Sequence, residues 1–167
     1  MLRPALQTTV QDLGRRGHRH LGVGLAGAMD RLALVAGNAL VGNADEAAAL
    51  ELCLPPAVIR FDADCVIALT GADCAARLDG ATLSVGNAMQ AKAGMTLELS
   101  HPTRGARAYL CVRGGFDVPL LLGSRSTDLQ TQMGGFDGRM IRRGDVLRVR
   151  STEPTSQPAG EIGRAHV

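Results

Sequence analysis

One short segment, Gly123–Asp128, combines the residue types that bind anions and carboxylates. It reads Gly-Ser-Arg-Ser-Thr-Asp, so it offers hydroxyl groups, a guanidinium group and a flexible backbone. The sequence pairs no histidine with these serines as a base, so it does not indicate a nucleophilic serine. Two interpretations carry equal weight: an anion-binding cradle, or a turn capped by serine and aspartate side chains.

Three acidic residues stand in apolar or glycine-rich segments, namely Asp12, Asp30 and Glu51. An ionisable group in such surroundings needs a partner, because burying an unpaired charge is costly. For each of them alone, the pattern favours a helix cap or a salt bridge over catalysis.

The segment Gly22–Gly27 satisfies G-x-G-x-x-G and precedes an expected helix, as in dinucleotide-binding proteins. That fingerprint requires a buried strand before it, and the preceding residues 15–20 read Arg-Arg-Gly-His-Arg-His. We therefore interpret Gly22–Gly27 as a glycine-rich loop leading into a helix. His18 and His20 supply two imidazoles without further ligands, so an exposed basic loop is favoured over a zinc site and no metal is expected.

The four cysteines form no C-x-x-C pair and lie in apolar surroundings, as in Leu52-Cys53-Leu54. We expect Cys53, Cys65, Cys74 and Cys111 to be small buried residues rather than metal ligands or disulfides.

The composition excludes some function classes. The 167 residues include 21 Gly, 7 Pro, 2% aromatic residues and a net charge of +2. Nucleic-acid binding by base stacking lacks its aromatic platforms and its basic charge. No stretch of the chain is apolar for the roughly 18 to 20 residues that cross a bilayer, and the first residues lack the apolar core of a secretory signal. We expect a cytoplasmic protein with no membrane and no nucleic-acid partner.

Short strands separated by turn residues predict a mainly β fold, and their spacing favours a sandwich or a barrel. Asp79-Gly80 predicts a hairpin turn, since both positions tolerate positive φ. One helix is expected over Met29–Leu40, with Asp30 in its first turn and Gly42 as its stop, and a second over Asp45–Leu52. The expected strands are 57–61, 66–69, 82–85, 96–99, 108–113 and 146–150.

The composition changes after residue 150. Residues 151–160 contain Pro154, Ser156 and Pro158 without apolar periodicity, which is typical of a linker. Residues 161–167 (Glu-Ile-Gly-Arg-Ala-His-Val) back-translate to a widely used sequencing adapter whose next codon is a stop. We expect these seven residues to be an artefact and the natural chain to have been cut near Gly160.

Taken together and in order, the motifs of residues 1–150 resemble those of one family. The chain is similar to the amino-terminal half of the biotin-dependent carboxyltransferase family, also called KipA or allophanate hydrolase subunit 2, which includes the C subunits of 5-oxoprolinases and a domain of urea carboxylase. The motifs are Thr-Thr-Val-Gln-Asp-Leu-Gly-Arg at 8–15, Gly-Ala-Met-Asp at 27–30, Ala-Gly-Asn-Ala-Leu-Val-Gly-Asn at 36–43, Ala-Leu-Glu-Leu at 49–52, Thr-Gly-Ala at 70–72, Tyr-Leu-Cys-Val-Arg-Gly-Gly at 109–115, Leu-Gly-Ser-Arg-Ser-Thr-Asp at 122–128, Gly-Gly-Phe-Asp-Gly-Arg at 134–139 and Gly-Asp at 144–145.

The resemblance implies a cyclophilin-like β-barrel with one or two short helices. It also implies a role in an ATP-dependent complex that hydrolyses 5-oxoproline to glutamate, beside a KipI-like subunit and a LamB/YcsF-like subunit. One alternative is biotin-dependent carboxyl transfer to urea or a related amide, and another is a regulatory protein that antagonises a KipI-like kinase inhibitor. ATP is then bound through the complex, and biotin is a further candidate cofactor.

Site residues follow from the same resemblance. Asp30 and Arg125 are expected to be catalytic: Arg125 would hold a carboxylate or carboxybiotin oxygen, and Asp30 would orient a donor or cap the helix. Family members have a second half that helps form the site, with an Asn-Arg-Met-Gly-Tyr type segment absent here. The chain alone is therefore expected to be inactive and to expose an apolar face. Substrate binding is assigned to Gln11, Asp12 and Arg15 near the glycine-rich loop, and to Ser124, Ser126 and Thr127 on a second rim.

Overall fold

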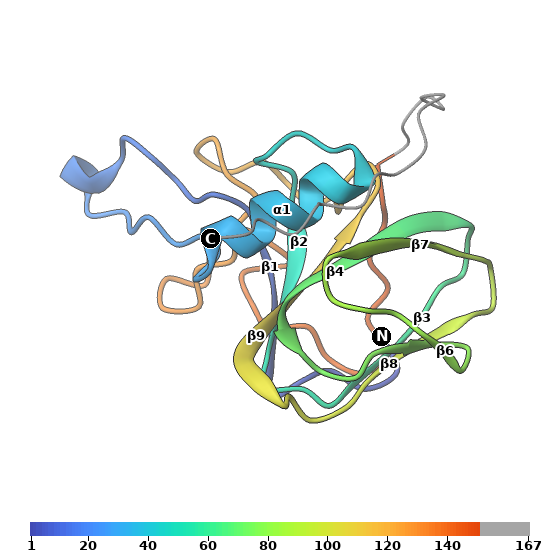
Figure 1. Ribbon diagram of the computed structural model, residues 1–167. Coiled ribbons are helices and arrows are strands. Elements are labelled where there is room, and N and C mark those ends of the chain that lie inside the picture. The colour runs from blue at the N-terminus through green and yellow to red at the C-terminus, as the bar shows by residue number, and fades with distance from the viewer. Residues whose placement is uncertain (151–167) are drawn as a thin grey trace, which may run out of the picture.

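Two antiparallel sheets and one α-helix make up the computed structural model, which describes residues 1–150 (Figure 1). The prediction of a mainly β, cyclophilin-like fold is confirmed. In chain order the elements are β1 (Gln7–Gln11), the 3-10 turn η1 (Arg19–Leu21), α1 (Arg31–Val41), β2 (Ala49–Cys53), β3 (Ala57–Arg60), β4 (Cys65–Asp73), β5 (Arg77–Leu78), β6 (Ala81–Thr82), β7 (Asn87–Ala91), β8 (Thr96–Leu99) and β9 (Arg104–Val112).

The larger sheet has the order β1-β2-β9-β4-β7 and the smaller one β3-β8-β5-β6. Along β9, Leu110 and Val112 point into the main core between the sheets, whereas Tyr109 and Cys111 point to the opposite face, where α1 packs. Because successive side chains of a strand alternate between faces, one buried strand serves both cores. The larger sheet is thus covered by the smaller sheet on one face and by α1 on the other (Figure 1).

The predicted helix over Met29–Leu40 is confirmed with shifted ends, as α1 spans Arg31–Val41. Asp30 is its N-cap residue rather than part of its first turn, because its carboxylate accepts a hydrogen bond from Ala33 N. Gly42 ends the helix in the left-handed conformation at φ 75°.

The alanine-rich composition of Asp45–Leu52 predicts a second helix, and this prediction is wrong. Ala49–Cys53 form β2, which pairs with β1 on one side and β9 on the other. All four residues Ala49–Leu52 are buried, so the strand lacks the alternation of buried and exposed residues that would mark it in the sequence. Strand pairing and burial on both faces here outweigh the helix propensity of alanine.

The remaining strand predictions meet mixed outcomes. The expected strands at 57–61, 66–69, 96–99 and 108–113 correspond to β3, β4, β8 and β9, and Asp79-Gly80 joins β5 to β6 with both φ values positive. The predicted strand 82–85 is wrong beyond Thr82, because Leu83 N bonds to Ala76 O after the hairpin ends. The predicted strand 146–150 is reduced to one bridge between Val149 and Phe116.

All four cysteines are free thiols; Cys74 and Cys111 are buried, and Cys53 and Cys65 are half-buried. Within residues 1–150, no helix is long and apolar enough to cross a membrane. The predicted linker 151–160 and the predicted adapter-derived segment 161–167 lie outside the described residues.

Candidate functional site

The carboxylate of Asp12 is the centre of the predicted site. Asp12 follows β1 directly and is buried. Its oxygens accept hydrogen bonds from Gly14 N at 2.8 Å, Ser124 Oγ at 2.7 Å and Ser126 Oγ at 2.5 Å, and from Arg125 N. One buried charge therefore holds the turn at 124–126 against the end of β1, with donors that compensate for its lost hydration.

Arg15 also contacts this turn, and the residue is only 1% exposed. Its Nε donates to Leu121 O at 3.3 Å and its Nη2 donates to Ser126 O. Within residues 1–150 no carboxylate lies within ion-pair distance of it, and Nη1 has no hydrogen-bond partner. Gly134, at φ 68°, packs against this guanidinium group, where a larger side chain would collide.

Gln11 and Thr127 extend the network along the outer edge of β1. Gln11 Nε2 donates to Thr9 Oγ1 at 3.0 Å and to Thr127 O at 3.1 Å. Thr127 donates to Val10 O through both its N–H and its hydroxyl. The six residues predicted to bind substrate are thus brought together as one buried network, rather than on two separate rims.

The contacts of segment 123–128 bear on its two interpretations, an anion-binding cradle and a capped turn. Ser124 and Ser126 direct their hydroxyls at Asp12, and Thr127 directs its hydroxyl at the backbone, as in a capped turn. An anion cradle would instead leave these donors free. The side chain of Arg125 does stay available, because its Nε donates to Val118 O at 3.1 Å while its terminal nitrogens have no acceptor within residues 1–150.

Asp30 lies on the surface at the start of α1, outside the buried network. Its Oδ1 accepts from Ala33 N at 3.0 Å, which is the predicted capping role. The backbone oxygen of Asp12 accepts a hydrogen bond from Ala28 N at 2.8 Å, which holds the segment that leads to Asp30. The carboxylate of Asp12 accepts a hydrogen bond from Arg125 N. The two residues predicted to be catalytic therefore depend on one buried anchor. Asp30 is exposed and Arg125 is half-buried, and both keep polar atoms that have no hydrogen-bond partner within residues 1–150.

A second buried cluster supports the start of α1, and the sequence revealed only one of its members. Glu51 Oε2 accepts from Tyr109 OH at 2.6 Å and Met29 N at 2.8 Å, and Glu51 Oε1 accepts from Arg107 Nε at 3.3 Å. Tyr109 OH also accepts from Asp30 N at 2.8 Å. Burial, and then the hydrogen bond to Glu51, raise the pKa of Tyr109. An acid within an apolar segment was the signal for Glu51, whereas no pattern of residue types singled out Tyr109 or Arg107.

Two pockets lie away from these residues. One, of about 710 Å³, opens between the two sheets beside Leu50, Leu110 and residues 146–150. The other, of about 670 Å³, lies between Pro4–Thr8 and the loops of residues 129–143. Neither is lined by any residue predicted to be catalytic or substrate-binding.

Comparison with known proteins gives consistent results. The family described as "Carboxyltransferase domain, subdomain A and B" matches residues 21–165. The C subunit of 5-oxoprolinase from Escherichia coli (strain K12) is 44% identical over 159 residues, covering 95% of this chain and 51% of that protein. Urea amidolyase of Saccharomyces cerevisiae is 40% identical over 151 residues, covering 90% of this chain and 8% of that protein. The crystal structure of the K. lactis urea amidolyase superposes with a TM-score of 0.87 at 38% identity, covering 96% of this chain and 10% of that one. The chain spans about half the length of the E. coli relative.

Proposed function

The chain belongs to the carboxyltransferase domain family, subdomains A and B, and from this membership we propose that it is the amino-terminal part of a protein like the 5-oxoprolinase C subunit. In this proposal it works in an ATP-dependent complex that hydrolyses 5-oxoproline to glutamate, with a KipI-like and a LamB/YcsF-like partner. The observation that carries the proposal is 44% identity to the E. coli 5-oxoprolinase C subunit over 95% of the chain.

The polar atoms that Arg125 and Asp30 leave without a partner within residues 1–150 suit an amide substrate. Opening a cyclic amide places negative charge on the carbonyl oxygen, and a donor held at that oxygen lowers the barrier. The terminal nitrogens of Arg125 supply such donors, or bind the substrate carboxylate, since a guanidinium group binds two oxygens at once. The free Oδ2 of Asp30 can orient an N–H donor. The remaining groups of the site come from parts of the protein beyond this chain.

The start of α1 does not suit the phosphates of ATP. A helix N-terminus binds phosphate when its N–H groups are free, but at α1 the carboxylate of Asp30 accepts the Ala33 N–H and would repel phosphate. Binding of ATP is therefore assigned to the partner subunits.

A second candidate function is carboxyl transfer to urea or a related amide, with biotin as the carrier. The identity to urea amidolyase of S. cerevisiae and the TM-score of 0.87 against the K. lactis structure favour it. Both reactions act on an amide carbonyl, so the same two groups would serve either one.

A chimera tests the choice directly. Residues 1–150 replace the matching part of the E. coli 5-oxoprolinase C subunit, and the purified chimera is combined with that enzyme's other subunits, ATP and 5-oxoproline. We expect ATP-dependent release of glutamate, and none from the 167-residue chain combined with the same subunits. The control is the chimera without ATP.

A folded chimera that releases no glutamate above this control would overturn the proposal. If the chimera instead passes carboxyl groups from carboxybiotin to urea, the second candidate replaces the first.

A further inference from the structure

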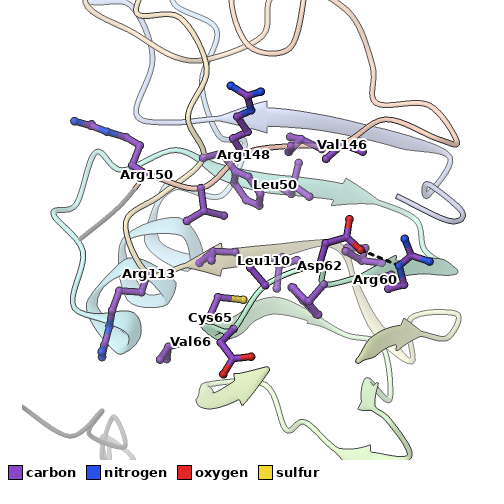
Figure 2. Close-up of a pocket in the computed structure, with 18 of the residues that line it drawn as sticks. Leu50, Arg60, Asp62, Cys65, Val66, Leu110, Arg113, Val146, Arg148 and Arg150 are labelled. Atoms are coloured by element: carbon purple, nitrogen blue, oxygen red, sulfur yellow. Dashed lines mark hydrogen bonds and ion pairs between the residues drawn. The ribbon is translucent and has the colours of Figure 1, made fainter. Parts of the chain in front are cut away.

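The pocket of about 710 Å³ between the two sheets has an apolar interior (Figure 2). Its floor is formed by Leu50 of β2, Leu110 of β9 and Ile59 of β3, which are buried within the main core. Val146 and Val149 also line the pocket and are 66% and 38% exposed, so they supply apolar surface that a ligand can reach. The volume lies in the range of pockets that take small ligands, and an apolar floor is the common lining of such pockets.

Charged side chains surround this interior, and the acidic ones are already paired. Asp62 bonds to Arg60 at 2.9 Å, and Asp64 bonds to Lys92 at 2.8 Å. These pairs are exposed, so they stabilise the fold little, but they neutralise both carboxylates of the lining.

The remaining charges of the rim are positive. Arg113, Arg148 and Arg150 line the pocket and have no carboxylate partner within residues 1–150. Figure 2 shows their guanidinium groups at the periphery, pointing away from the centre where Leu50 and Leu110 lie. Long arginine side chains commonly place their stems on apolar surface and their charge at its edge. An apolar ligand with one anionic end would therefore meet an opposite charge where it leaves the pocket.

We propose that this pocket binds a small amphipathic anion, with an alkyl or aryl body on the apolar floor and a carboxylate or sulfonate group at the arginine rim. Arg148 and Arg150 are the residues assigned to the anionic group, because both are exposed and free to turn, whereas Arg113 Nε donates to Val41 O at 3.0 Å. The site is independent of the proposed function, since it shares no residue with the Asp12 network.

The probe for this site is decanoate, titrated into the 167-residue chain and followed by calorimetry and by methyl chemical shifts of the leucines. We expect saturable binding with shifts at Leu50 and Leu110. The double variant Arg148→Glu/Arg150→Glu should weaken binding about tenfold or more, because the charge contact is replaced by repulsion. Decanol, which has the same body without the charge, should bind more weakly than decanoate.

The matched control is Arg142→Glu/Arg143→Glu, which makes the same charge change at exposed positions lining the other pocket. This variant should bind decanoate with little change in affinity. The proposal is overturned if decanoate does not bind at millimolar concentration, if both double variants weaken binding equally, or if the shifts appear at Leu6 and Leu129 of the other pocket instead.

Discussion

Asp12 receives four hydrogen-bond donors at a buried carboxylate. Those donors come from two segments more than 100 residues apart in the sequence, so the charge joins the end of β1 to the turn at 124–126. The predicted substrate-binding residues around it use most of their polar atoms on one another. At the scale of single residues, the network acts as the support for Arg125 and Asp30, which keep polar atoms without a partner within residues 1–150.

Removing the Asp12 carboxylate should therefore destabilise the fold. We expect Asp12→Ala to lower the free energy of unfolding by about 3 kcal/mol, because it leaves buried hydroxyl and N–H donors without an acceptor. Urea denaturation followed by circular dichroism measures this change. The control is Asp117→Ala, at an exposed carboxylate, which should change the stability by less than about 0.5 kcal/mol. Equal effects of the two variants would show that Asp12 supports nothing.

Asp145 gives a pH-dependent prediction. Its carboxylate accepts two hydrogen bonds from Arg139, at 2.7 and 3.1 Å, and these hold its pKa below the ordinary value of 3.8. The pair therefore contributes fully at pH 7. Its contribution falls as the pH drops below about 4, since the unfolded chain then binds the proton first. Asp145→Asn should lower the urea midpoint more at pH 7 than at pH 3, and a difference that is constant over this range would contradict the account.

The sequence marks the residues that the structure gathers around Asp12, but it does not fix their roles. A segment with serine, arginine and threonine reads equally as a cradle and as a capped turn, because the outcome depends on whether an acid from elsewhere accepts the hydroxyls. Asp12 is that acid, and it lies 112 residues from Ser124. Tyr109 gave no signal for the same reason: its partner, Glu51, lies on another strand.

At the scale of elements, α1 is placed by contacts at its start and at its middle. Glu51 and Tyr109 hold the backbone of Met29 and Asp30, and Gly37 lies against Cys111 of β9 and Thr70 of β4. Because Asp30 caps this helix, the position of its outward oxygen depends on both contacts.

The hydroxyl of Tyr109 should be important for the start of α1. Tyr109→Phe leaves Asp30 N–H without its acceptor and removes one of the three donors to Glu51, and we expect a loss of about 1 to 2 kcal/mol in the free energy of unfolding. Amide exchange at Asp30 should become faster, as measured by NMR. In a double-mutant cycle, Glu51→Gln should cost less in the Tyr109→Phe background than alone. Strict additivity would show that the two side chains do not act together.

At Gly37 we predict that substitution by alanine destabilises the protein, the opposite of its usual effect in a helix. In an exposed helix, Gly→Ala stabilises by about 1 kcal/mol, but a Cβ at Gly37 would lie 2.6 Å from Cys111 Sγ and 2.9 Å from Thr70 Oγ1. We expect Gly37→Ala to lower the melting temperature, since the helix must move away from the sheet. Adding Cys111→Ala should recover part of the loss. A melting temperature that rises in the single variant would contradict the packing described.

The elements that could be predicted from the sequence are marked by residues within the element itself. The element that was missed forms only because it pairs with strands that are distant in the sequence. α1 has apolar periodicity and a cap, and the β5–β6 hairpin has Asp79-Gly80. β2 has neither, since both of its faces are buried, and only its pairing with β1 and β9 makes it a strand. Residues 146–150 have a strand-like pattern but only one bridging partner, Phe116, so no strand forms.

At the scale of the whole molecule, several large apolar side chains are exposed. Met29 and Leu32 are 70% and 83% exposed at the start of α1, and Leu120–Leu122 are exposed in the loop that Arg15 holds. Figure 1 shows the turn Arg19–Leu21 projecting from the body of the molecule on the side of the start of α1. If the chain is the amino-terminal part of a longer protein, as proposed, we expect the side at the start of α1 to be covered there.

The most direct test of the proposed site is made in the chimera, with Arg125→Ala compared with Arg143→Ala. Both variants remove one arginine side chain, but only Arg125 presents its terminal nitrogens beside the Asp12 network. We expect Arg125→Ala to lower ATP-dependent glutamate release by about 100-fold or more, with the circular dichroism spectrum unchanged, while Arg143→Ala keeps nearly full activity. Equal rates in the two folded variants would contradict the assignment of the site.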